Sequence, residues 1–265
     1  MRVSGNLRKM KGELKEKVHY YLELGGENIA MNDLPGKKIS IHYQDTIHCI
    51  RCGRETKRSF AQGYCYPCFT TAPETEECVL RPELCQAHEG IARDMEFAKE
   101  HCLIDHYVYI SLTSGLKVGV TRHHQVPVRW IDQGAIRAVK VAITPNRYIA
   151  GNIEVALKER MNDKTNWRNM LTNKVDSSID LVEQKDKAID SLHPDFQAMA
   201  TDDDEVTHLE YPVLEYPVKV KSLNLDKTPV IEDVLMGIKG QYLIFESGAV
   251  INIRKFGGYL VELSF

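Results

Sequence analysis

Several features that mark membrane, secreted or repetitive proteins are absent from this sequence of 265 residues. No apolar run approaches the roughly 20 residues that a membrane-spanning helix requires. The first residues, MRVSGNLRKMKG, lack the apolar core of a secretory signal peptide. Internal repeats and low-complexity tracts are also missing, and the 43% hydrophobic content is ordinary for a folded chain. We therefore expect a soluble cytoplasmic protein with no membrane partner.

A strong net charge is absent as well, because 34 Lys and Arg residues face 37 Asp and Glu residues, giving −3. The charge is unevenly distributed. Residues 176–210 carry eleven acidic residues against two lysines, a local charge of −9, so the rest of the chain sums to +6. A mildly basic body can meet phosphate, although an ordinary solvated surface explains the same charge.

Local composition predicts β-rich ends and a mixed middle. Strands are predicted for VHYYLEL and KKISIHY, and later for VLEYPVKVKSL, DVLMGIKGQYLIF, AVINIR and GYLVEL. Between them we expect a hairpin (HYVYISL, TSG, LKVGV), a helix over VPVRWIDQGA, a third strand AIRAVKVAI, and helices over GNIEVALKERM and NWRNMLTNKV. A helix followed by a loop at DDDE is expected in the acidic stretch.

These elements predict an α+β protein with five segments. They are an N-terminal β segment (1–46), a zinc-binding module (47–104), an α/β domain (105–175), an acidic helix and linker (176–210) and a C-terminal β unit (211–265). We expect both chain ends to form one β-barrel-like unit, with the zinc module and the α/β domain inserted between them. Two separate small β units are the alternative.

The clearest motif consists of two CxxC pairs, Cys49/Cys52 and Cys65/Cys68, which twelve residues separate. Tight turns bring such thiolates onto one tetrahedral ion, so this spacing predicts a closed, structural Zn²⁺ site without a catalytic position. Seven cysteines, an odd number in this spacing, favour a reducing compartment over disulfides. Basic and aromatic neighbours can contact nucleic acid, or they can simply be the charged rim of a structural site.

A second, looser cluster follows in C-V-L-R-P-E-L-C-Q-A-H. It offers Cys78, Cys85 and His88, and Cys102 can complete a tetrahedron. The alternative is that these cysteines are small buried residues and that His88 is a surface side chain.

The central segment resembles the GIY-YIG endonuclease superfamily, most closely its phage-type branch. The likeness covers about 105–171 and rests on an ordered set of residues: Y-V-Y ending at Tyr109, K-V-G ending at Gly119, an Arg on a following helix (Arg129) and a Glu on a later helix (Glu154). The resemblance implies a three-stranded antiparallel sheet with helices. It also implies cleavage of phosphodiesters that depends on a divalent metal.

The roles implied by this resemblance map onto the four residues. Tyr109 would act as general base or position a water, and Gly119 would allow close approach beside it. Arg129 would stabilise negative charge on the phosphodiester, and Glu154 would hold one divalent ion, Mg²⁺. Packing and solvated-surface roles are the alternatives for these residues.

The whole chain also resembles an uncharacterised bacterial domain-of-unknown-function family that combines a double CxxC with phrases such as KVGVTR, RWIDQGA and GIKGQYLIF. Members of that family often carry a further cysteine near the position of Ala92. This likeness implies no activity.

Three functions follow as hypotheses. The first is a zinc-binding protein that interacts with DNA or RNA through a nuclease-like centre, possessing or having lost hydrolase activity. The second is a non-enzymatic adaptor for nucleic acid or a protein, motivated by Lys117 at the position of the superfamily's second tyrosine. The third is a hydrolase that uses an open zinc at Cys78, Cys85 and His88.

Overall fold

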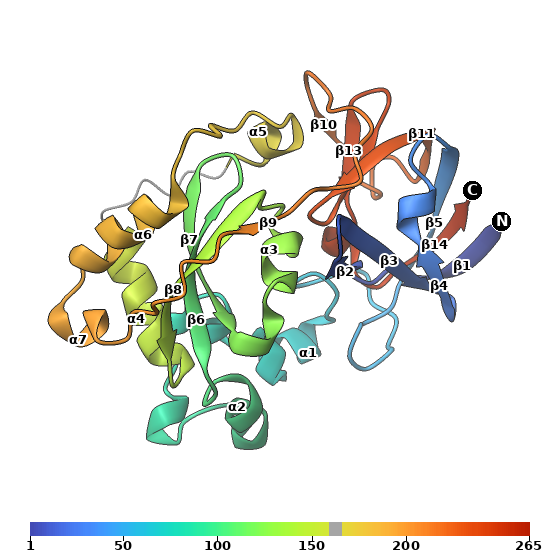
Figure 1. Cartoon of the computed structure of the whole chain (residues 1–265). Helices are drawn as coiled ribbons and strands as arrows, with labels where there is room; N and C mark the ends of the chain where they lie inside the picture. Colours follow the sequence, from blue (N-terminus) through green and yellow to red (C-terminus); the bar gives the residue numbers. More distant parts are fainter. Residues whose placement is uncertain (159–165) are drawn as a thin grey trace.

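The computed structural model describes residues 1–158 and 166–265, which form a mixed α+β protein (Figure 1). Its largest sheet combines both ends of the chain in the order β1-β14-β5-β11-β12-β13-β10. The strands are β1 (Arg2–Asn6), β14 (Tyr259–Ser264), β5 (Lys38–Ile47), β11 (Val230–Lys239), β12 (Tyr242–Phe245), β13 (Ala249–Asn252) and β10 (Lys221–Ser222). Every pairing is antiparallel except the one between β13 and β10.

The expected barrel does not close. Strands β1 and β10 are the two edges of this sheet and do not pair with each other. Closure would require a long strand at the β10 edge, but β10 contains two residues and pairs over that length only. The sheet is therefore open in the described part of the chain.

The prediction of a strand over 213–223 is also wrong for most of that stretch. Only β10 and an isolated bridge from Val213 to Gly237 pair in this stretch. Pro217 has no N–H to donate to a ladder, and Leu214 and Val218 are exposed to 64% and 82%. Without pairing or burial, these residues run as a surface loop.

A small second sheet packs on the first and consists of β2 (Lys11–Leu14), β3 (Val18–Leu24) and β4 (Glu27–Ala30), followed by the 3₁₀ turn η1 (Met31–Asp33). Alternate residues of β3 are buried, as the period of a strand requires: Val18, Tyr20, Leu22 and Leu24. These side chains join the core of the large sheet.

The third sheet is formed by the middle of the chain, in the order β7-β6-β8-β9. Its strands are β6 (His106–Leu112), β7 (Leu116–Arg122), β8 (Arg137–Thr144) and β9 (Thr207–His208). The predicted hairpin is present, with β6 between β7 and β8 in antiparallel register. The expected three strands gain a fourth, β9, which follows the acidic stretch.

Helices cover this sheet on two sides. Apolar residues of α4 (Arg147–Lys158) and α6 (Leu181–Asp190) pack with Val108, Ile110 and Leu112 of β6. Trp130 and Ile131 of α3 (Val128–Asp132) share the large core with Tyr109. Short helices α5 (Trp167–Leu171) and α7 (Pro194–Gln197) complete this part. The predicted helix over 151–161 begins earlier, at Arg147, and its last three residues lie outside the described residues.

The cysteine-rich segment connects the sheets with short turns of helix. They are α1 (Tyr66–Thr71), η2 (Pro73–Thr75), η3 (Glu77–Val79), η4 (Pro82–Leu84), η5 (Ala87–Glu89) and α2 (Met95–His101); η6 (His123–Gln125) and η7 (Ile253–Phe256) lie further along the chain. No helix in the described residues has the length and apolar character to cross a bilayer.

Candidate metal centres and basic cavity

The first four cysteines converge as their spacing predicts. The Sγ atoms of Cys49, Cys52, Cys65 and Cys68 all lie within 4.8 Å of one another. A tetrahedral ion with metal–sulfur bonds of about 2.3 Å separates its sulfurs by roughly 3.8 Å. The distance from Cys52 Sγ to Cys65 Sγ is 3.8 Å. The geometry therefore suits a four-coordinate ion such as zinc.

The backbone around Cys49 also favours the ionised sulfur that a metal requires. Burial opposes ionisation of Cys49, but backbone N–H groups of Cys52, Cys65 and Arg51 outweigh it and lower the pKa of the thiol to about 6. Gly53 supports the first turn with a φ of 70°, a left-handed conformation that glycine adopts without strain.

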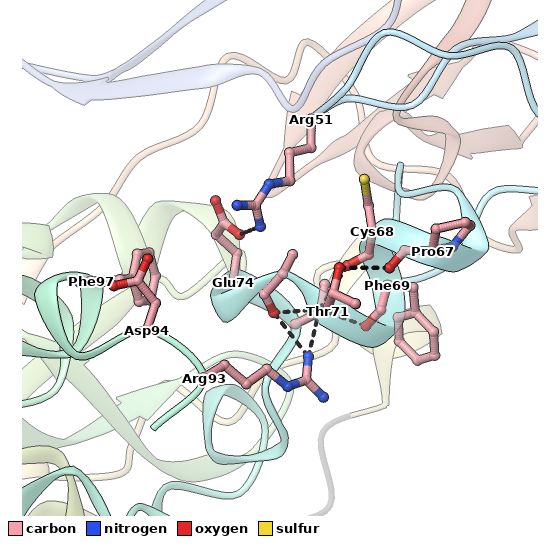
Figure 2. A network of polar contacts seen from close by, with 11 residues as sticks. Arg51, Pro67, Cys68, Phe69, Thr71, Glu74, Arg93, Asp94 and Phe97 are labelled. Carbon is pink, nitrogen blue, oxygen red and sulfur yellow. Dashed lines mark hydrogen bonds and ion pairs between the residues drawn. The ribbon is translucent and has the colours of Figure 1, made fainter. Parts of the chain in front are cut away.

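Polar contacts fix helix α1 beside this centre (Figure 2). Arg51, between the first two cysteines, forms an ion pair of 2.8 Å with Glu74. Arg93 Nη1 donates to the carbonyl oxygen of Ala72 at 2.9 Å, just after α1 ends. The loop of the first cysteine pair and the segment that follows α1 are thus tied together, and α1 lies between them.

Folding assembles a second cluster from three cysteines. The Sγ atoms of Cys78, Cys85 and Cys102 lie within 4.8 Å of one another, and all three residues are buried. Arg147 Nη1 lies 3.9 Å from Cys78 Sγ, where its charge favours a thiolate. Hydrogen bonds from Cys102 and Cys78 lower the pKa of Cys85. Three thiols in this arrangement are suitable ligands for a metal ion.

His88 does not join these thiols. Its ring stacks on Tyr148, with centroids 4.3 Å apart and an interplanar angle of 19°. The predicted set of four is therefore reduced to three cysteines in the described residues. A small cavity of about 180 Å³ opens beside them and is lined also by Glu76, Glu77 and Ala92.

Tyr109 and Gly119 are directly paired across β6 and β7. The Tyr109 side chain is fully buried, and its hydroxyl donates to Gln133 Oε1 at 2.9 Å. A Cβ atom at position 119 would lie 2.5 Å from that hydroxyl, so only glycine fits opposite. The space beside Gly119 is thus occupied by the tyrosine itself.

Arg129 and Glu154 lie close enough to influence this phenol. Burial raises the pKa of Tyr109, while the charge of Arg129 lowers it and that of Glu154 raises it. Glu154 is only 8% exposed and forms an i,i+4 ion pair of 2.9 Å with Lys158. The structure thus brings three of the four predicted residues near Tyr109, but it buries the tyrosine and the glutamate.

Arg129 instead opens into a basic cavity of about 250 Å³ between the sheets. Five basic residues and one acidic residue line it: Lys9, Arg122, Arg129, Arg147, Arg254 and Asp132. Asp132 is already engaged, because it forms an ion pair of 2.7 Å with Lys9 and accepts a hydrogen bond from Gln241. None of the four arginines has an ion-pair partner within the described residues.

The arginines destabilise one another's charge. Burial and the nearby Arg147 lower the pKa of Arg122. Burial also lowers the pKa of Arg254; the nearby Asp132 opposes this effect, and Arg129 adds to it. His106, another lining residue, is buried, and desolvation lowers its pKa to about 4, so it is neutral at pH 7. A cavity with this excess of positive charge attracts anions.

Sequence reasoning missed most of this cavity. It identified Arg129 as a phosphate-binding residue and left Lys9 and Arg147 unassigned. These residues are remote from one another in the chain, and no local pattern links them. The one available signal was the closeness of KVGVTR to RWIDQGA in the sequence, because it places Arg122 close to Arg129.

The fold and the thiol clusters together define an α+β protein with an open sheet and two cysteine sites that are suited to metal ions. The chain belongs to the family described as Protein of unknown function (DUF2797), which matches residues 36–261. No curated protein matches it. No solved structure matches it either. The likeness to GIY-YIG endonucleases stays a prediction.

Proposed function

We propose that this protein is a zinc-stabilised nucleic-acid-binding protein whose basic cavity holds backbone phosphate. The observation that carries the proposal is the group of four arginines that share a cavity without an ion-pair partner in the described residues. Guanidinium groups bind phosphate oxygens through charge-assisted, bidentate hydrogen bonds. The arginines of this net positive cavity can donate to a phosphodiester the hydrogen bonds that water molecules otherwise donate to it.

Zinc at the two thiol clusters supports this function by holding the cavity walls. Cys78 carries the segment that includes Val79 and Pro82, which line the basic cavity beside Arg147. The four-cysteine centre fixes residues 49–68, of which Ile50 and Tyr64 line an adjoining cavity. Four thiolates fill the coordination positions of a tetrahedral ion, so that centre stabilises the fold and leaves no position for a substrate.

Binding is tested by the anisotropy of labelled DNA and RNA oligonucleotides as a function of salt. Arg122→Gln is expected to weaken binding and to reduce the slope of log K against log salt by about 1, as for loss of one phosphate contact. Arg2→Gln is the matched control, because Arg2 lies on the edge strand β1, away from the cavity. Equal binding by both variants would refute the assignment.

Phosphodiester cleavage is the second candidate function. It is favoured by the proximity of Arg129 and Glu154 to the Tyr109 hydroxyl, as their effects on its pKa indicate. Because burial raises that pKa, the phenol would act in its neutral form, orienting a water or donating a hydrogen bond, and not as a ready base. Mg²⁺ at Glu154 would require the carboxylate to leave Lys158.

Cleavage is tested with Mg²⁺ or Mn²⁺ on the same oligonucleotides. Glu154→Gln is expected to abolish turnover and to leave binding in place. Glu183→Gln is a close control, because Glu183 also pairs with a lysine four residues later on a helix. Binding without turnover by the unmodified protein would leave the adaptor function as the conclusion.

A further inference from the structure

A second cavity, largely apolar, adjoins the basic one. It has a volume of about 430 Å³, within the range of small-molecule and cofactor sites. Its wall includes the apolar and aromatic side chains of Ile50, Tyr64, Phe69, Val79 and Leu80. Leu80, one of these lining residues, is 88% exposed.

The two cavities share part of their walls. Lys9, Val79 and Arg254 line both of them. The apolar cavity therefore opens directly beside the four arginines, and a single ligand can reach both. Such a ligand needs a flat or apolar group next to an anionic group.

Polar groups stand around the apolar cavity in positions that allow further recognition. Gln62, Thr75 and Glu76 are among its lining residues. Glu74 is held by Arg51, and Thr75 Oγ1 donates to the carbonyl oxygen of Phe69 at 2.7 Å. These contacts fix the wall, while Gln62 is exposed, and its amide is available to the edge of a ring.

We propose that the paired cavities bind one segment of single-stranded nucleic acid, with an unstacked nucleobase in the apolar cavity and its phosphate among the arginines. This inference rests on the proposed function and adds the strandedness of the substrate. Bases in a duplex are stacked and paired, so only an unpaired base can enter a pocket. Aromatic side chains such as Tyr64 and Phe69 accept any base, because every base has a π face.

The test compares three labelled ligands of equal length on the metal-loaded, full-length protein: a single strand, an oligomer of abasic residues and a duplex. DNA and RNA versions of the single strand are both measured. We expect the single strand to bind about tenfold or more tightly than the abasic oligomer, since stacking of one base contributes about that much. The duplex is expected to bind like the abasic oligomer, through phosphate alone.

Substitutions locate the base. Leu80→Asn changes an exposed side chain and is expected to weaken binding of the single strand several-fold while leaving the abasic oligomer unchanged. Leu214→Asn, at another exposed leucine remote from both cavities, is the control. Arg254→Gln is expected to weaken both ligands, because Arg254 lines both cavities.

The outcomes separate the two proposals. If the ordinary and the abasic oligomer bind with equal affinity and Arg122→Gln weakens both, the base-binding proposal is overturned and the phosphate-binding proposal stands. Binding of duplex as tightly as single strand, unaffected by Leu80→Asn, would overturn the base-binding proposal equally. Failure of every oligonucleotide to bind at low salt would refute the proposed function, and this inference with it.

Discussion

Lys239 provides a stringent test of the energetics, because its ammonium group lies inside the protein. The residue is fully buried, and Nζ has one hydrogen-bond partner in the described residues, Asn173 Oδ1 at 3.2 Å. The rings of Tyr211 and Tyr216 lie 5.5 and 5.1 Å from Nζ. Burial lowers the pKa of Lys239 from its ordinary 10.5 to about 8.

The magnitude follows from this difference. Each pKa unit corresponds to 1.36 kcal/mol, so keeping the amine charged inside the fold costs about 3 kcal/mol. Because the folded pKa lies below the unfolded one, the unfolded chain binds more protons between pH 8 and 10.5. Stability therefore rises with pH through that window, and the full cost is present below pH 8.

Lys239→Met removes the charge and keeps the length of the side chain. We expect the variant to be more stable than the unmodified protein by at most about 3 kcal/mol at pH 7, with the gap falling below about 1 kcal/mol at pH 10. Urea denaturation at pH 7, 8, 9 and 10 measures both values. Lys187→Met, at an exposed lysine, should show no such pH-dependent gap.

The reasoning would be refuted by a gap that is the same at pH 7 and pH 10. That result would mean that the amine has the same pKa in the folded and the unfolded chain, so that its charge is fully compensated in the fold, as by the tyrosine rings. The raised pKa of Tyr20, which is not in contact with Lys239, lowers stability at higher pH in both proteins, so it cancels from the comparison.

Three further predictions concern packing and metal. Gly151→Ala is expected to destabilise the protein by about 1–3 kcal/mol although alanine favours helices, because the new Cβ would lie 2.2 Å from the backbone nitrogen of Glu83; a stabilised variant in urea denaturation would contradict this. Gly119→Ala is expected to lower the free energy of unfolding by a similar amount, because the new Cβ would displace the Tyr109 hydroxyl. Adding Tyr109→Phe to this variant removes the hydroxyl and should restore part of the lost stability. Additive losses in the double variant would contradict this. Elemental analysis should find two zinc ions per chain, one for each thiol cluster. Removal of these ions by a chelator should abolish oligonucleotide binding until zinc is restored. Unchanged binding by the metal-free protein would contradict the role of the clusters.

Elements with strong local patterns were predictable from the sequence. The hairpin of β6 and β7 follows from dense β-branched and aromatic residues around the turn TSG. The four-cysteine centre follows from two tight CxxC turns, which need little help from the rest of the fold. In both cases the determining contacts lie within about twenty residues of one another.

Features that depend on distant contacts were not predictable in this way. The stretch 213–223 has strand-like composition, but pairing partners decide whether such a stretch forms a strand, and here they are lacking. His88 has the spacing of a ligand, but its ring packs on Tyr148 of a helix sixty residues further along the chain. Arg254 and Lys9 meet Arg129 only because the large sheet brings the chain ends to the middle segment.

That large sheet also has a consequence for the order in which the chain folds. Strand β5 lies between β14 and β11, which are completed only when residues 230–264 have been synthesised. Contacts of such high sequence separation form slowly, because the long intervening loop must first be closed. The cysteines, all between positions 49 and 102, leave the ribosome much earlier. We therefore expect a metal ion to reach the four-cysteine centre before the sheet closes, so that the supply of this ion during synthesis affects the yield of folded chain.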